Sequence, residues 1–335
     1  SNIVAECAAR TYNTLINQGV ELGTHLYMFT GGEPLIRKKD IITLARENKD
    51  CIFLAFTNGT LVDDELCEDI KSCGNLALAL SIEGSEEVND SRRGEGVYQK
   101  TLNAMKLLKK HKCLFGTSVC YTSKNYDSVT SDEFYDFMIE NGAKFAWYFH
   151  YMPVGADADT ELLLTPEQRE HVYRTIRQNR NSKTGKPIFT VDFQNDGEFV
   201  GGRNYFHVNS EGDVEPCVFI HYSDSNIREK SILECLKSPL FHEYYKGQPF
   251  NDNMLRPCPM LENPQKLRQL INKTGAKSTN LLQNESAEEL CAKCDLYAQN
   301  WAPKAKEIWE EQERFHPFTQ YYRDTPEGKK EFANK

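Results

Sequence analysis

Thr30-Gly31-Gly32-Glu33-Pro34 directly follows the apolar run Leu26-Tyr27-Met28-Phe29. An amphipathic stretch begins at about residue 38, so the five residues are expected on a loop between a strand and a helix. Two consecutive glycines allow a ligand to approach the backbone closely, because neither carries a Cβ atom. Glu33 adds a carboxylate suited to binding an ammonium group. A tight turn that binds nothing is the alternative for this loop.

The alternation of short apolar runs and longer amphipathic stretches continues to about residue 190. Repeated βα units of this kind are typical of a parallel sheet covered by helices. The sequence therefore predicts an α/β fold, a partial (β/α)6 TIM-type barrel whose loops after the strands build the site. Strands are expected at residues 24–30, 51–57, 76–82, 114–121, 144–151 and, as an extended segment, 187–193; helices are expected at 38–48, 63–73, 97–111, 131–141 and 165–181.

The two ends of the chain depart from this rhythm. A helix is expected at residues 3–18, although a βα barrel begins on a strand, so we expect a first strand and its loop to lie upstream of Ser1 or outside this sequence. After about residue 194 Gly, Pro and Cys become frequent. We predict a partial barrel at residues 1–194, a small irregular Cys-rich domain at 195–302 that is not held by a hydrophobic core, and a charged helical tail at 303–335.

Length and composition exclude several classes of function. A chain of 335 residues can bury a substantial core. Its net charge of −9 argues against nucleic acid as a partner, because phosphate binding depends on clustered Lys and Arg. No apolar run approaches the roughly 20 residues that span a bilayer. We predict a cytoplasmic protein without a membrane or nucleic-acid partner, in which the 11 cysteines are thiols or metal ligands.

Three more segments follow expected strands as the first loop does. They are Thr57-Asn58-Gly59-Thr60, Ser81-Ile82-Glu83-Gly84 and the run from Ser91 to Tyr98 that contains Arg92 and Arg93. Together with the Gly-Gly-Glu-Pro loop they resemble the radical S-adenosylmethionine (SAM) superfamily. The aromatic segment from Trp147 to Gly155 falls where that family places the adenine.

The resemblance implies SAM as a cofactor, with its amino group on the Gly-Gly-Glu-Pro loop and its carboxylate on Arg92 or Arg93, of which we favour Arg93. It also implies a [4Fe–4S] cluster that cleaves SAM to a 5′-deoxyadenosyl radical, which abstracts hydrogen from a substrate. An electron donor such as ferredoxin or flavodoxin is the implied partner. The expected cofactor-binding residues are Thr30, Gly31, Gly32, Glu33, Pro34, Asn58, Ser81, Glu83, Arg93, Met152 and Val154.

The catalytic cluster requires three thiolates, which the family supplies from a CxxxCxxC loop after the first strand. This sequence contains no such motif, and Cys7 is the only cysteine before Gly31. Either the loop lies outside this sequence, or the chain is a degenerate relative that serves as a binding or structural protein.

A second set of cysteines, Cys217, Cys258, Cys291 and Cys294, lies in the irregular C-terminal region. Gly212 followed by Cys217 resembles the start of the SPASM or twitch extension, which implies an auxiliary [4Fe–4S] cluster on these four residues. The family also expects a cysteine about a dozen residues before the glycine, and residues 196–203 contain none. A zinc site on the same cysteines, as in a cluster-free barrel lyase, and unligated thiols are the alternatives.

The substrate stays open, because SPASM relatives modify either peptides or small molecules, and no catalytic residue is assigned. His150 is expected to be a satisfied polar residue. Five polar aromatic residues either line the site or pack as ordinary core residues: Tyr126, Tyr205, His207, His221 and Tyr222.

Overall fold

The computed structural model describes residues 2–155, 157–180, 185–195, 201–280 and 283–313, with side chains from residue 12 to residue 311. Its centre is a sheet of six parallel strands in the order β1-β2-β3-β4-β5-β6. This confirms the predicted partial barrel, since each strand pairs with the next one along the chain. The strands are β1 (Leu26–Phe29), β2 (Ile52–Thr57), β3 (Leu76–Ser81), β4 (Phe115–Tyr121), β5 (Phe145–His150) and β6 (Phe189–Asp192).

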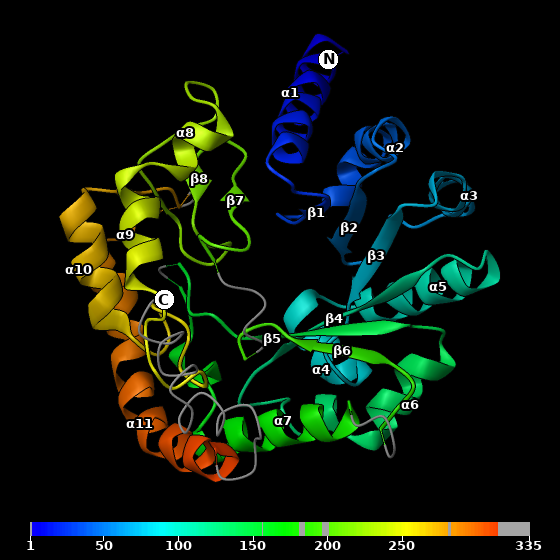
Figure 1. Cartoon of the computed structure of the whole chain (residues 1–335). Helices are drawn as coiled ribbons and strands as arrows, with labels where there is room; N and C mark the ends of the chain where they lie inside the picture. Colours follow the sequence, from blue (N-terminus) through cyan, green and yellow to red (C-terminus); the bar gives the residue numbers. More distant parts are fainter. Residues whose placement is uncertain (1, 156, 181–184, 196–200, 281–282, 314–335) are drawn as a thin grey trace, which may run out of the picture.

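Helices cover the outer face of the curved sheet (Figure 1). Their ends follow local chemistry: Asp63 accepts a hydrogen bond from the Leu66 amide at the start of α3, and Thr165 forms a capping box with Gln168 at the start of α7. The helices are α2 (Lys38–Glu47), α3 (Asp64–Cys73), α5 (Val97–Lys110), α6 (Asp132–Glu140) and α7 (Pro166–Asn179), with short 3-10 turns η1 (Pro34–Arg37), η2 (Ser128–Thr130) and η3 (Thr160–Leu162).

Two helices of the barrel region have special positions. The expected N-terminal helix is α1 (Asn2–Glu21), which lies between α2 and the C-terminal region, where Gln18 accepts a hydrogen bond from the Ile232 amide at 2.8 Å. Helix α4 (Glu86–Arg93) was not expected from the sequence. It places Arg92 and Arg93 in its last turn, from which both guanidinium groups reach the Glu83 carboxylate.

The C-terminal region has more regular structure than the sequence predicts. It contains a hydrophobic cluster in which Leu240, Leu261 and Leu267 are completely buried, so the expectation that no hydrophobic core holds this region is wrong. Helix α11 also runs through the expected boundary between residues 302 and 303. The elements are β7 (His207–Val208), β8 (Val214–Glu215), β9 (Tyr222–Ser223), α8 (Ile232–Leu236), α9 (Pro239–Gly247), α10 (Pro264–Thr274), β10 (Lys277–Ser278) and α11 (Ala287–Glu313).

A buried arginine joins the barrel to the C-terminal region. Arg169, on α7, is 1% exposed and forms an ion pair with Glu262 at 2.7 Å, between side chains that are both almost completely buried. Its guanidinium also donates to the Tyr297 hydroxyl on α11 at 2.7 Å and lies 4.3 Å from the centre of the Trp301 ring. The barrel and the C-terminal region are therefore connected by a desolvated ion pair with further hydrogen-bond acceptors.

No helix in the described part of the chain is long and apolar enough to cross a membrane.

We predict that Arg169→Met lowers the free energy of unfolding by about 3–5 kcal/mol, because Glu262 is left buried without its partner. Arg169→Met combined with Glu262→Gln should be less destabilising than the single substitution. The matched control is Arg174→Met, which removes an exposed arginine of the same helix and should change stability by about 0–1 kcal/mol. Urea unfolding followed by circular dichroism measures all three, and equal effects of Arg169→Met and Arg174→Met would contradict the prediction.

Candidate functional site

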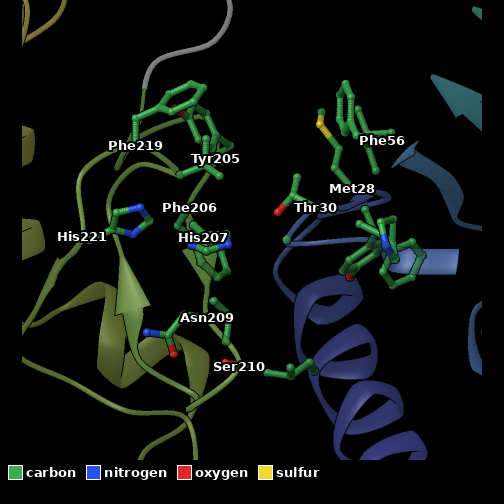
Figure 2. A pocket seen from close by; sticks show the side chains of 18 of the residues that line it. Met28, Thr30, Phe56, Tyr205, Phe206, His207, Asn209, Ser210, Phe219 and His221 are labelled. Atoms are coloured by element: carbon green, nitrogen blue, oxygen red, sulfur yellow. The ribbon is translucent and has the colours of Figure 1, made fainter. Parts of the chain in front are cut away.

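A cavity of about 1740 Å³ lies at the carboxyl ends of the strands, between the sheet and the C-terminal region. One wall carries Met28, Thr30 and Phe56 from β1, its following loop and β2. The opposite wall carries residues from the segment that begins at residue 202, including Tyr205 and Phe219 (Figure 2). Sites of parallel barrels lie at this end of the sheet, so this cavity is the candidate site.

The Gly-Gly-Glu-Pro loop presents bare backbone to the cavity. Gly31 has a φ of +103°, which residues with a side chain rarely adopt, and it lines the cavity together with Gly32. A Cβ atom built on either glycine meets no other atom within 4 Å. The peptide groups of the loop are therefore open to a ligand, which fits the binding of a small zwitterion such as SAM.

Glu33 joins the loops that follow the first two strands. One of its carboxylate oxygens accepts hydrogen bonds from the Leu35 amide at 2.9 Å and the Thr57 hydroxyl at 2.7 Å. The other accepts from the Asn58 amide at 2.9 Å. These bonds hold the carboxylate at the cavity wall, so Glu33 both shapes the loop and presents a negative charge to a ligand.

Arg92 is the arginine of α4 that reaches the cavity, where it lies beside Cys120. Glu83, which is completely buried, accepts hydrogen bonds from Arg93 and forms an ion pair with Arg92 at 2.6 Å. Arg93 does not line the cavity. Both arginines pair with Glu83, but of the two Arg92 lines the cavity. The geometry therefore favours Arg92 over the expected Arg93 as the ligand contact, and the choice between them stays a prediction.

The structure brings seven of the expected cofactor-binding residues to the cavity and leaves four outside its lining. Asn58 is outside because its side-chain oxygen accepts hydrogen bonds from Thr60, which stabilise the turn after β2. Ser81, Glu83 and Arg93 are also outside the lining, and their roles as cofactor contacts stay predictions. The residues that line the cavity are Thr30, Gly31, Gly32, Glu33, Pro34, Met152 and Val154.

His150, at the end of β5, has both ring nitrogens engaged. Nδ1 lies 2.8 Å from the Tyr151 carbonyl, and Nε2 lies 2.8 Å from the Tyr297 hydroxyl. Because Arg169 donates to that hydroxyl, we assign the hydroxyl as the donor to Nε2 and Nδ1–H as the donor to the carbonyl. Burial lowers the pKa of His150 to about 3, and Arg169 acts in the same direction. His150 is a satisfied, uncharged polar residue, as expected from the sequence.

The wall opposite the Gly-Gly-Glu-Pro loop contains residues that could not be assigned from the sequence either to the site or to ordinary packing. Tyr205, His207 and His221 line the cavity, whereas Tyr126 and Tyr222 do not. Behind the two histidines lies Glu215, which is completely buried; burial acts to raise its pKa, but hydrogen bonds from His207, His221 and Thr279 lower it to about 2. Irregular segments show no periodicity, so the sequence indicated these cavity residues only through their nearness to Gly212 and Cys217.

The four cysteines proposed as cluster ligands share one hydrophobic cluster of the C-terminal region. Burial raises the pKa of each thiol, most clearly that of Cys258. Within the described residues, no three His, Cys, Asp or Glu side chains are placed to hold one metal ion. The assignment of Cys217, Cys258, Cys291 and Cys294 as ligands of an iron–sulfur cluster stays a prediction, and so does the zinc alternative.

The fold and the cavity define a class of protein: a partial parallel barrel with a ligand-binding loop at its strand ends and a cysteine-containing domain opposite. Residues 11–138 match the radical SAM superfamily, and residues 200–260 match the iron–sulfur cluster-binding domain called SPASM. The chain belongs to the radical SAM superfamily and carries a SPASM-type C-terminal domain. It is a radical SAM enzyme by class, for which the family implies SAM and catalytic and auxiliary [4Fe–4S] clusters as cofactors.

The chain is similar to an AdoMet-dependent heme synthase of Methanosarcina barkeri, with 28% identity over 249 residues that cover 65% of this chain and 70% of the relative. Its fold is similar to that of anSMEcpe with bound AdoMet, at a TM-score of 0.55 and 16% identity, over 89% of each chain. It is also similar to Streptococcus suis SuiB bound to the precursor peptide SuiA, at a TM-score of 0.59 and 18% identity, over 86% of this chain and 69% of SuiB.

We predict that His150 makes the protein less stable in mild acid. Because its pKa is about 3 in the folded protein and 6.5 is its ordinary value, the unfolded chain binds the extra proton between these values. Stability attributable to His150 should fall by up to about 1.4 kcal/mol for each pH unit below 6.5. His150→Gln should remove this part of the pH dependence, whereas His25→Gln, at an exposed histidine, should keep it. Urea unfolding at about pH 6 and about pH 5 measures the slopes, and identical slopes for His150→Gln and the unsubstituted protein would contradict the assignment.

Proposed function

We propose that this chain binds SAM on the barrel wall of the cavity and directs the resulting 5′-deoxyadenosyl radical to a substrate held against the SPASM wall. The observation that carries the proposal is the cavity itself, because the Gly-Gly-Glu-Pro loop and Arg92 of the barrel line it together with residues of the SPASM region. A radical formed between these walls is shielded from water by protein on both sides. Bound SAM supplies the radical chemistry, and the residues of this chain position it.

Each end of SAM has a matching group in the structure. The open peptide groups of Gly31 and Gly32 and the Glu33 carboxylate suit the ammonium group. The guanidinium of Arg92 suits the carboxylate, since a planar fork of N–H donors matches two carboxylate oxygens. The backbone between Met152 and Val154 lines the same cavity and is proposed to contact the adenine.

The catalytic cluster is a different case, because the residues of this sequence do not supply three thiolates for it. The only cysteine before Gly31 is Cys7, whose side chain lies outside the described residues. The proposed reaction therefore requires a CxxxCxxC loop beyond the sequence given. Without that loop, binding of SAM or of a substrate without radical chemistry is the alternative function. The source gene distinguishes the two.

Cys217, Cys258, Cys291 and Cys294 are proposed to hold an auxiliary [4Fe–4S] cluster in the SPASM-type domain. A ferredoxin or flavodoxin is proposed as electron donor, and the cytoplasm as the compartment. We also propose that the barrel comprises residues 1–194 and the cluster-binding domain residues 195–302, with residues 303–335 forming a tail. The reported relatives support either a small molecule, as the name heme synthase indicates, or a peptide, as the SuiB complex indicates, for the substrate.

We predict that Glu33→Ala and Arg92→Ala each weaken SAM binding by roughly ten- to a hundredfold, because each removes a charge-assisted hydrogen bond worth about 1.5–3 kcal/mol. Titration calorimetry with SAM measures both. Arg46→Ala is the control, because Arg46 is paired with Asp69 on the outer face and does not line the cavity. Unchanged affinity in both cavity variants would refute the SAM site, and thermal melts separate loss of a contact from loss of the fold.

We predict that replacing any one of Cys217, Cys258, Cys291 and Cys294 by Ala lowers the iron and sulfide content and the visible absorption of anaerobically reconstituted protein, because a cluster depends on its thiolates. Cys235→Ala is the matched control, since Cys235 is as buried as Cys291 and Cys294 in the same region but is not in the set. A colourless protein that contains zinc would support the zinc alternative instead.

A further inference from the structure

The SPASM wall of the cavity is basic. It contributes six lining side chains that are or can become positively charged, whereas none of its described lining residues is Asp or Glu. The acidic lining residues, Glu33 and Asp40, both lie on the barrel side. The chain as a whole has a net charge of −9, so this concentration of basic groups opposes the overall composition. The six residues are Arg203, His207, His221, Arg228, Lys237 and His242.

Two of these groups are held in fixed orientations by a buried carboxylate. The Nδ1 atoms of His207 and His221 lie 2.7 Å and 3.2 Å from the same oxygen of Glu215. The other oxygen accepts hydrogen bonds from Thr279 at 2.5 Å and Asn209 at 3.3 Å. Glu215 is 0% exposed, whereas the two imidazole side chains are 21% and 30% exposed. Bonding at Nδ1 leaves the Nε2 edge of each ring for a ligand.

The longer basic side chains of this wall keep their charges largely available. Arg203 lies over the Tyr245 ring, 5.1 Å from its centre, and has no ion pair within the described part of the chain. Lys237 also has no ion pair among the residues with described side chains. Arg228 approaches Glu211 only to 3.9 Å, at the surface, where such a pair is weak. A ligand anion would not have to break a strong ion pair to reach them.

We propose that this wall is the substrate-binding subsite and that it recognises carboxylate groups, so that the substrate is a polycarboxylate. In their protonated form, in which both ring nitrogens carry hydrogen, His207 and His221 donate Nδ1–H to Glu215 and bind one carboxylate through Nε2–H. Arg203, Arg228 and Lys237 attract the remaining carboxylates. A positive wall in a negatively charged protein also directs an anionic substrate to this side of the cavity. The inference rests on the proposed function, since it names the substrate class of that same cavity.

The test uses two carboxylate sources with the full-length protein. The first probe is coproporphyrin III, a fluorescent tetrapyrrole with four carboxylates, titrated by fluorescence. The second is a short Glu-rich peptide, titrated against its Gln counterpart. We expect one of the acidic probes to bind, with an affinity that falls as salt is raised, and the identity of that probe distinguishes a small molecule from a peptide. Failure of both acidic probes to bind, or equal binding of the Glu and Gln peptides without porphyrin binding, would overturn the proposal.

Matched variants locate the binding. His207→Asn and His221→Asn retain a side-chain N–H near the Nδ1 position for Glu215 but remove the cavity-facing nitrogen. Each should lower the affinity for the bound probe by about tenfold. Lys237→Ala should weaken it by a few-fold, because an exposed charge is partly screened. Lys230→Ala is the control, since Lys230 is exposed on the same domain but does not line the cavity, and it should leave affinity unchanged. Equal effects of Lys237→Ala and Lys230→Ala, with no effect of the histidine substitutions, would contradict the subsite.

SAM affinity, measured on the same preparations, separates this inference from the proposed function. Retained SAM binding in the histidine variants shows that the cavity is folded, so that loss of the probe is a local effect. SAM binding without binding of either acidic probe overturns the polycarboxylate subsite alone. Probe binding that depends on the histidines, in a protein that does not bind SAM, supports the subsite and refutes the proposed SAM site.

Discussion

The site depends on one buried interaction, the ion pair between Arg169 and Glu262. The cavity needs both parts of the chain: the barrel provides the loop after β1, and the C-terminal region provides the facing residues (Figure 2). Arg169 fixes their separation, because it binds Tyr297 and Glu262 on one side and is anchored in α7 on the other. A buried ion pair adds little net stability compared with apolar packing, but loss of one partner leaves the other charge buried and uncompensated. It therefore specifies how the two parts meet.

The two walls divide the chemistry between them. The barrel wall combines open peptide groups with Glu33 and Arg92, which suit a zwitterion. The SPASM wall combines basic side chains with imidazole rings held by Glu215, which suit an anion. Both walls contain a basic side chain that is oriented by a buried carboxylate. Glu83 pairs with Arg92 on the barrel wall, and Glu215 pairs with His207 on the SPASM wall. Such carboxylates reduce the conformational freedom that binding would otherwise remove.

Local sequence predicted the barrel well and the cofactor residues only in part. The apolar runs gave all six strands within a few residues, because strands buried on both faces leave a simple hydrophobic signal. The Gly-Gly-Glu-Pro loop could be located because it directly follows an apolar run of this kind. The choice between Arg92 and Arg93 could not be made from the sequence, because which of two neighbouring side chains lines the cavity depends on helix α4, which was not expected. The core of the C-terminal region was missed, as its apolar residues come from short elements far apart in the chain.

The sequence by itself determined the parallel strands, the loops that follow them, and the family to which the chain belongs. The strands and loops leave a local pattern of apolar runs and turn residues, which can be read from periodicity and motifs. Only the tertiary structure decided that Glu83 lies behind Arg92, that His150 is bonded through both nitrogens, and that Glu215 holds two histidines at the cavity. The His150–Tyr297 bond joins the barrel to the C-terminal region across 147 positions of the chain. The other contacts join residues close in the chain, but they depend on helix α4 and on irregular turns, whose side-chain directions leave no periodic pattern in the sequence.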